Sequence, residues 1–67
     1  MIKYFDEKNR TVVYNSKNGK CADIVKFEDY CMGSVKTKFR IDVGGITKES
    51  MIASKSAAKN KSKKYVL

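Results

Sequence analysis

The sequence predicts a small α+β protein in which an antiparallel sheet is combined with two helices. Residues 35–43 alternate between apolar and polar side chains, and two dipeptides are typical of hairpin turns. The C-terminal run is rich in alanine and lysine and contains neither glycine nor proline. A chain of 67 residues buries only about 60% of the surface that it exposes when unfolded. We therefore expect one domain, residues 1–67, with a thin core.

An N-terminal hairpin is predicted from two short segments, IKYF (residues 2–5) and TVVY (residues 11–14). Both are rich in β-branched and aromatic residues, which favour strands. The polar residues 6–10 between them predict the turn. Asn18-Gly19 predicts another turn after the hairpin, because this dipeptide readily adopts positive φ angles.

The segment CADIVKFEDYCM, residues 21–32, fits both a helix and a strand. In a helix, Ile24 and Phe27 share the apolar face. In a strand, Phe27 shares a face with Val25, whereas Ile24 lies on the other face. The helical pattern matches more apolar positions, and helices commonly end at a glycine such as Gly33. The pattern therefore favours a helix at about 21–32.

A pair of strands is predicted at residues 34–52. Residues 35–43 alternate strictly, so that one face is mainly apolar and the other mainly cationic. The inner face carries Val35, Thr37, Phe39, Ile41 and Val43, and the outer face carries Lys36, Lys38, Arg40 and Asp42. Gly44-Gly45 can supply the positive φ angles of a two-residue turn, after which residues 46–52 return as the second strand.

A basic helix is predicted at about 54–66. Ser54 is a good N-cap, and the two alanines that follow in the first turn favour a helix. The lysines that such a helix would present in one row are Lys55, Lys59 and Lys63. The composition of residues 54–67 approaches that of disordered segments, so fraying of this end stays open.

The positive charge is concentrated in the second half of the sequence. The net charge is +8. Residues 1–33 contain six basic and five acidic residues, whereas residues 34–67 contain nine basic and two acidic residues. A field of this kind attracts polyanions, so nucleic acid or an acidic protein surface is expected as the partner before a neutral small molecule.

The sequence offers no catalytic or metal-binding arrangement. It contains no histidine, which removes the usual general base near neutral pH and the Ser-His and Cys-His dyads. Cys21 and Cys31 form no Cys-x-x-Cys pattern. We therefore expect no enzyme activity, no cofactor and no metal, and two reduced thiols.

The sequence also predicts where the protein works. No apolar run approaches the roughly 20 residues of a membrane-spanning helix. The N-terminal segment MIKYFDEKNR lacks the apolar core of a signal peptide. We expect an intracellular protein, cytoplasmic or in the nucleoid or nucleus, without a membrane partner.

Two segments resemble double-stranded RNA-binding domains. Ser54-Lys55-x-x-Ala58-Lys59-Asn60 resembles the S-K-K-x-A-K-N signature that opens the last helix of that family. The segment FRIDVGG, residues 39–45, resembles the F-x-V-x-V-x-G strand and turn before that helix. The resemblance spans about residues 18–67 and is to a shortened, degenerate form. The stretch from Asn18 to Ser54 is too short for a full α-β-β-β-α unit, no Gly-Pro-x-His loop is present, and Ser56 replaces the second lysine. It implies that residues 21–32 are the first helix, with Glu28 near a ribose hydroxyl.

Together these features predict a non-catalytic nucleic-acid-binding module, with double-stranded RNA favoured and DNA also compatible. The partial positive charge at a helix N-terminus and a row of lysines suit the phosphates of A-form RNA. The predicted contacts are Ser54, Lys55, Lys59 and Lys63 on the helix, a secondary strip of Lys36, Lys38 and Arg40, and Glu28. Stacking of single strands is less expected, because Phe39 falls on the inner face and the tyrosines form no evident platform.

A second hypothesis is a small phage-type or host-factor inhibitor or adaptor that binds a larger protein. The small size, the basic surface and the lack of catalytic groups suit this role as well. The sheet edges and the side chains of Val12, Tyr14 or Tyr30 could form the interface with that protein. Exposed sheet edges would also permit two chains to associate as a homodimer. A nuclease-resistant complex with a protein would separate this hypothesis from nucleic-acid binding.

Overall fold

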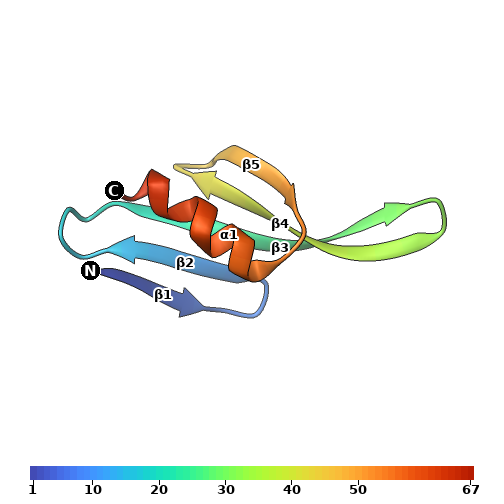
Figure 1. Cartoon of the computed structure of the whole chain (residues 1–67), viewed down its shortest axis with the longest axis horizontal. Helices are drawn as coiled ribbons and strands as arrows, with labels where there is room; N and C mark the ends of the chain where they lie inside the picture. Colours follow the sequence, from blue (N-terminus) through green and yellow to red (C-terminus); the bar gives the residue numbers. More distant parts are fainter.

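Each strand of the chain pairs with the next, so the five strands form one antiparallel meander (Figure 1). The computed structural model describes all residues, 1–67. The elements are β1 (Ile2–Asp6), β2 (Arg10–Asn15), β3 (Cys21–Cys31), β4 (Ser34–Val43), β5 (Ile46–Ile52), α1 (Lys55–Ser62) and a 3-10 turn at Lys63–Tyr65. The helix lies on one face of the sheet and leaves the other face uncovered. The predicted α+β class is confirmed.

Two tight turns set the register of the hairpins. Met32 and Gly33 have φ angles of 49° and 78°, and they join Cys31 to Ser34, which pair directly. The predicted Gly44-Gly45 turn has φ angles of 59° and 83°. Positive φ at both central residues is typical of two-residue hairpins, because that twist matches the twist of the flanking strands. The N-terminal hairpin and the strand pair at 34–52 are confirmed.

The predicted helix at residues 21–32 is wrong, because this segment forms β3. Ala22 and Ile24 are buried on one side of the strand, and Gly33 completes a turn instead of ending a helix. The reason is non-local: β3 finds hydrogen-bonding partners on both of its edges, in β2 and in β4. Pairing of this kind outweighs a local pattern that fits either structure.

The core lies between α1 and the centre of the sheet. It consists of Val13, Ala22, Ile24, Ile41, Ile52, Ala58 and Val66. On the helical side the buried positions are Ala58, Ser62 and Val66, spaced by four residues, and the Ser62 hydroxyl donates to the carbonyl of Lys59 at 2.8 Å. Tyr65 is only half-buried beside this stripe. No helix of the chain has the length and apolarity needed to cross a membrane.

The end of the chain is held against the β2–β3 turn. The side-chain amides of Asn15 and Asn18 both donate to the carbonyl of Val66, at 2.7 and 3.1 Å. Lys20 Nζ donates to the carbonyl of Leu67 at 3.2 Å. The helix predicted at about 54–66 is confirmed as α1 and the 3-10 turn, and these bonds satisfy polar groups at its end.

The β3–β4 hairpin extends beyond the rest of the sheet (Figure 1). β2 accompanies β3 only as far as Val25, and β5 accompanies β4 only from Phe39 onward. We call the two-stranded remainder, residues 27–38, the hairpin arm. Val35 and Thr37 lie in this arm and are exposed, although the alternating pattern predicted them to be buried. The helix does not cover this part of the sheet. Val35 and Thr37 therefore stay exposed although they lie on the same face as the core residues.

A substitution of Ile41 tests whether this thin core stabilises the folded protein. We expect Ile41→Ala to lower the free energy of unfolding by about 2–5 kcal/mol, because it removes buried methyl groups and leaves a cavity. Ile46→Ala is the matched control, since Ile46 is 61% exposed, and it should change stability by less than about 0.5 kcal/mol. Urea unfolding followed by circular dichroism measures both. Equal effects would contradict the assigned core.

Candidate nucleic-acid interface

The residues predicted to contact nucleic acid are divided between two surfaces. Lys36, Lys38 and Arg40 alternate with the core residue Ile41 along β4, so they lie on the uncovered face of the sheet. Ser54, Lys55, Lys59 and Lys63 belong to the helical layer on the opposite face. A single flat contact therefore cannot include both groups.

The helix begins as the sequence predicts. Ser54 has extended backbone angles, and its Oγ accepts a hydrogen bond from the Ala57 backbone N–H at 3.1 Å. This N-cap satisfies one of the free amides at the start of α1. The lysine row that follows is partly engaged within the protein: Lys55 Nζ lies 2.7 Å from Asp6 Oδ1, and the Lys59 ammonium lies 4.8 Å from the centre of the Tyr4 ring. Lys63 makes no ion pair.

Two carboxylates of the sheet, Asp6 and Glu49, form ion pairs with lysines of the helical layer. Glu49 Oε2 accepts a hydrogen bond from the Tyr65 hydroxyl at 2.9 Å and lies 3.1 Å from Lys64 Nζ. These two contacts, in that order, hold the pKa of Glu49 below its ordinary value. The pKa of Asp6 is lowered chiefly by its hydrogen bond with Lys55. The helical layer is thus less free to bind an anion than its lysine content indicates.

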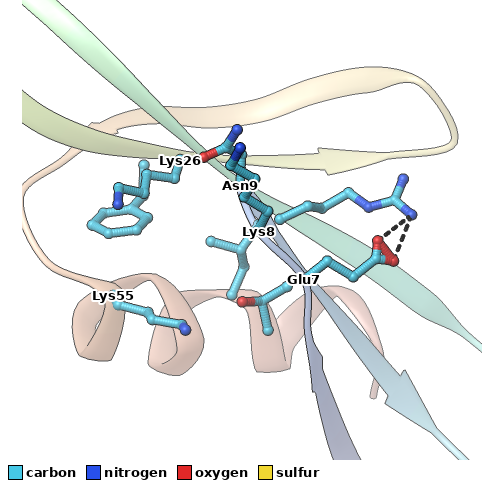
Figure 2. A pocket seen from close by; sticks show the side chains of 9 residues that line it. Glu7, Lys8, Asn9, Lys26 and Lys55 are labelled. Carbon is cyan, nitrogen blue, oxygen red and sulfur yellow. Dashed lines mark hydrogen bonds and ion pairs between the residues drawn. The ribbon is translucent and has the colours of Figure 1, made fainter.

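A small cationic cavity lies between the β1–β2 turn and the start of α1 (Figure 2). Its volume is about 140 Å³, well below the roughly 300–1,000 Å³ of sites that enclose small-molecule ligands. Lys8 from the turn, Lys26 from β3 and Lys55 from α1 stand around it. Arg10 also lines it and forms an ion pair with Glu7 at 3.2 Å. The cavity could admit a phosphate group but not a drug-sized ligand.

Glu28 does not take part in this cavity. It lies in the hairpin arm, where its carboxylate accepts a hydrogen bond from the Tyr30 hydroxyl at 2.8 Å. Tyr30 is 72% exposed, so the pair lies on the surface. The structure does not place Glu28 among the residues around the start of α1.

The uncovered face of the sheet carries an apolar surface of which the sequence analysis named only Val12 and Tyr14, as possible contacts of a protein partner. Five large side chains point away from the helix there: Phe5, Val12, Tyr14, Val25 and Phe27. Phe5 is 52% exposed and the other four are half-buried. Phe27 joins this face only because residues 21–31 form a strand. No other element of the protein packs over it.

Cations lie between these apolar residues. The strand register places Arg10 and Arg40 on either side of Val25, and it pairs Phe27 with Lys38. The charged residues that the strand register places on the face are Lys3, Arg10, Lys36, Lys38 and Arg40, with Asp23, Asp29 and Asp42. The face is thus both apolar and positively charged.

One of the acids on this face is already satisfied within the protein. Asp42 lies 3.2 Å from Arg40 Nε and accepts a hydrogen bond from the Thr47 hydroxyl at 2.7 Å. Asp23 pairs with Asp42 across the strands but accepts no hydrogen bond from another side chain. The Asp23 carboxylate therefore remains available to a ligand.

The two cysteines lie at opposite ends of β3. Cys21 is its first residue and Cys31 its last, and both thiols are free and exposed. No group of three or more Cys, Asp or Glu side chains is placed to hold a metal ion.

The resemblance to double-stranded RNA-binding domains is local in this fold. Comparison of the chain with known protein families, with curated proteins and with solved structures finds no match. The segment that the resemblance assigned to the first helix is β3. The similar residues 39–45 and 54–60 lie in β4 with its turn and in α1 with its cap.

The ion pairs of α1 should make stability depend on pH. Because the folded-state pKa values of Asp6 and Glu49 are lowered, their stabilisation is present above the ordinary carboxylate pKa and is lost as the pH falls through the lowered values. We expect the urea midpoint to fall as the pH decreases from about 5 to 3. Glu49→Gln should weaken that dependence.

Glu28→Gln is the control for this measurement, because it removes a carboxylate that forms no ion pair. Its urea midpoints should follow those of the unmodified protein at each pH. If Glu49→Gln and Glu28→Gln gave the same profile, the contacts of Glu49 with α1 would contribute nothing to stability.

Proposed function

We propose that this protein is a non-catalytic nucleic-acid-binding module that binds through the uncovered face of its sheet. The observation that carries the proposal is the combination of five apolar side chains and a set of cations on a face that no other element covers. Nucleic acid is complementary to that face, because its phosphates can pair with the cations and its bases present apolar surfaces to the apolar side chains.

The apolar part of this face points to a partner. An antiparallel sheet with one face in water normally alternates apolar residues inward and polar residues outward. In β2 and β3, Val12, Tyr14 and Val25 depart from that rule, since each is apolar although a neighbouring residue is buried on the helical side. Phe27 adds a fourth apolar side chain to the uncovered face. Contiguous apolar surface of this kind commonly marks an interaction site in small soluble proteins.

The charge of the face favours a polyanion over a second copy of the chain. The face carries five cations, Lys3, Arg10, Lys36, Lys38 and Arg40, and three carboxylates, and the whole chain has a net charge of +8. Two such faces would repel each other on contact. Binding to a phosphate backbone is instead favoured, because the cations release counterions from the nucleic acid. Charge complementarity therefore supports nucleic acid as the occupant.

The helical layer supports a second candidate function, binding of double-stranded RNA as the sequence predicted. Its specific support is the capped start of α1 beside the cationic cavity, together with Lys63, which makes no ion pair. Backbone amides at a helix N-terminus and nearby lysines suit phosphates lining an RNA groove. The engagement of Lys55 and Lys59 with β1 makes this surface the weaker of the two.

A pair of charge-reversal variants separates the two surfaces. Lys36→Glu/Lys38→Glu alters the uncovered face and Lys59→Glu/Lys63→Glu alters the helix, and each lowers the net charge by the same amount. Lys36 and Lys38 form no ion pairs within the chain. We expect the first variant to weaken nucleic-acid binding by at least about tenfold and to reduce the salt slope by roughly 0.7–0.9 per lost phosphate contact. The second should bind nearly as tightly as the unmodified protein.

Fluorescence anisotropy with single- and double-stranded RNA and DNA, at two salt concentrations, measures these effects. If only the helix variant lost binding to duplex RNA, the binding surface would be the helical layer and not the uncovered face. Unchanged binding in both variants would contradict nucleic-acid binding as the function. A protein partner that survives nuclease treatment would then become the favoured hypothesis.

A further inference from the structure

We infer that the uncovered face takes single-stranded nucleic acid, with bases stacked on Phe27 and Phe5 and the backbone lying along β4. This inference rests on the proposed function and specifies its substrate class. It depends on where the cations, the aromatic rings and the acids lie relative to one another on the face.

The cations of β4 form a track for a backbone. Lys36, Lys38 and Arg40 occupy alternate positions on one face, so successive side chains are about 6.8 Å apart along the strand. An extended single strand can follow a straight row of this kind. A duplex presents its phosphates along a helical path and would meet fewer of them at once.

Aromatic rings lie beside this track. Phe27 is directly opposite Lys38 in the register, and Val25 continues the apolar surface to Arg40. Phe5, at 52% exposure, extends it to the edge strand β1. Stacking on such rings is available to any base, but only when the base is outside a duplex. The half-buried Phe27 and the exposed Phe5 therefore favour single strands.

The acids on the face restrict where the backbone can lie. Asp23 and Asp42 face each other across β3 and β4, on the side of Arg40 away from the arm. They would repel phosphates, and Asp29, which pairs with Lys36 across the strands, would do the same at the other end of the row. The backbone is therefore confined to the part of the row around Lys38 and Arg40. A base directed toward Asp23 could donate its amino group to this carboxylate, in the way that acidic side chains accept from cytosine.

The track continues into a hollow on the hairpin arm. The hollow has a volume of about 340 Å³ and is lined by Lys36, Lys38 and Asp29 together with the methionines Met32 and Met51. This volume lies at the lower end of the roughly 300–1,000 Å³ typical of ligand sites. It gives a terminal nucleotide an apolar wall beside two cations.

The test compares Phe27→Leu with Tyr30→Leu, using a 12-nucleotide single strand and a hairpin duplex of the same composition. Both variants replace an aromatic ring of the arm region by leucine, but Tyr30 lies on the opposite face of the hairpin. We expect Phe27→Leu to weaken single-strand binding roughly 5- to 100-fold, with the salt slope unchanged, because stacking is lost and phosphate contacts remain. Tyr30→Leu should bind as the unmodified protein does.

A second variant reports stacking directly. The chain contains no tryptophan, so Phe5→Trp introduces a single indole at the exposed aromatic position of β1. Its fluorescence should be quenched when the single strand is added and should change little with the hairpin duplex. Circular dichroism and urea midpoints confirm that each variant is folded before binding is compared.

The outcomes separate this inference from the proposed function. If Lys36→Glu/Lys38→Glu abolishes binding while Phe27→Leu binds normally and Phe5→Trp is not quenched, the face binds a backbone and stacking is refuted. Equal affinity for the hairpin duplex and the single strand would also overturn the inference. Loss of single-strand binding in Phe27→Leu, with quenching of Phe5→Trp, would support it.

Discussion

The pairing of β3 on both of its edges is the constraint on which the rest of the structure depends. Ile24 lies opposite Thr11 on one side and opposite Ile41 on the other. The buried side of this row forms the centre of the core beneath α1. The other side of the same strand contributes Val25 and Phe27 to the uncovered face. Core, uncovered face and hairpin arm therefore all arise from one strand.

The parts of the fold that could be predicted are those specified by neighbouring residues. The two-residue turn at Gly44-Gly45, the alternation of β4 and the cap at Ser54 all follow from local rules. The segment 21–32 was assigned wrongly by local rules, because its apolar spacing fits a strand but matches more positions of a helix. Only its pairing with β2 and β4, which lie outside the segment itself, decides between them.

The candidate site was harder to predict than the fold, for a related reason. The positive charges of residues 34–67 are divided between two faces of the protein. Lys36, Lys38 and Arg40 point away from the helical layer, which carries most of the other lysines. The contact between Lys55 and Asp6 joins opposite ends of the chain and has no signal in the local sequence. A useful signal was present in β2, where Val12 and Tyr14 are apolar on the side opposite Val13.

The positions of the cysteines determine how oxidation would act on this protein. Cys21 and Cys31 begin and end an extended strand, which separates them by about 34 Å at 3.4 Å per residue. A disulfide requires its two Cα atoms to lie within about 7 Å of each other. The native fold therefore cannot close a bridge within one chain. Under oxidising conditions its exposed thiols would link separate molecules, and covalent oligomers seen without reductant would report thiol chemistry instead of a folded dimer interface.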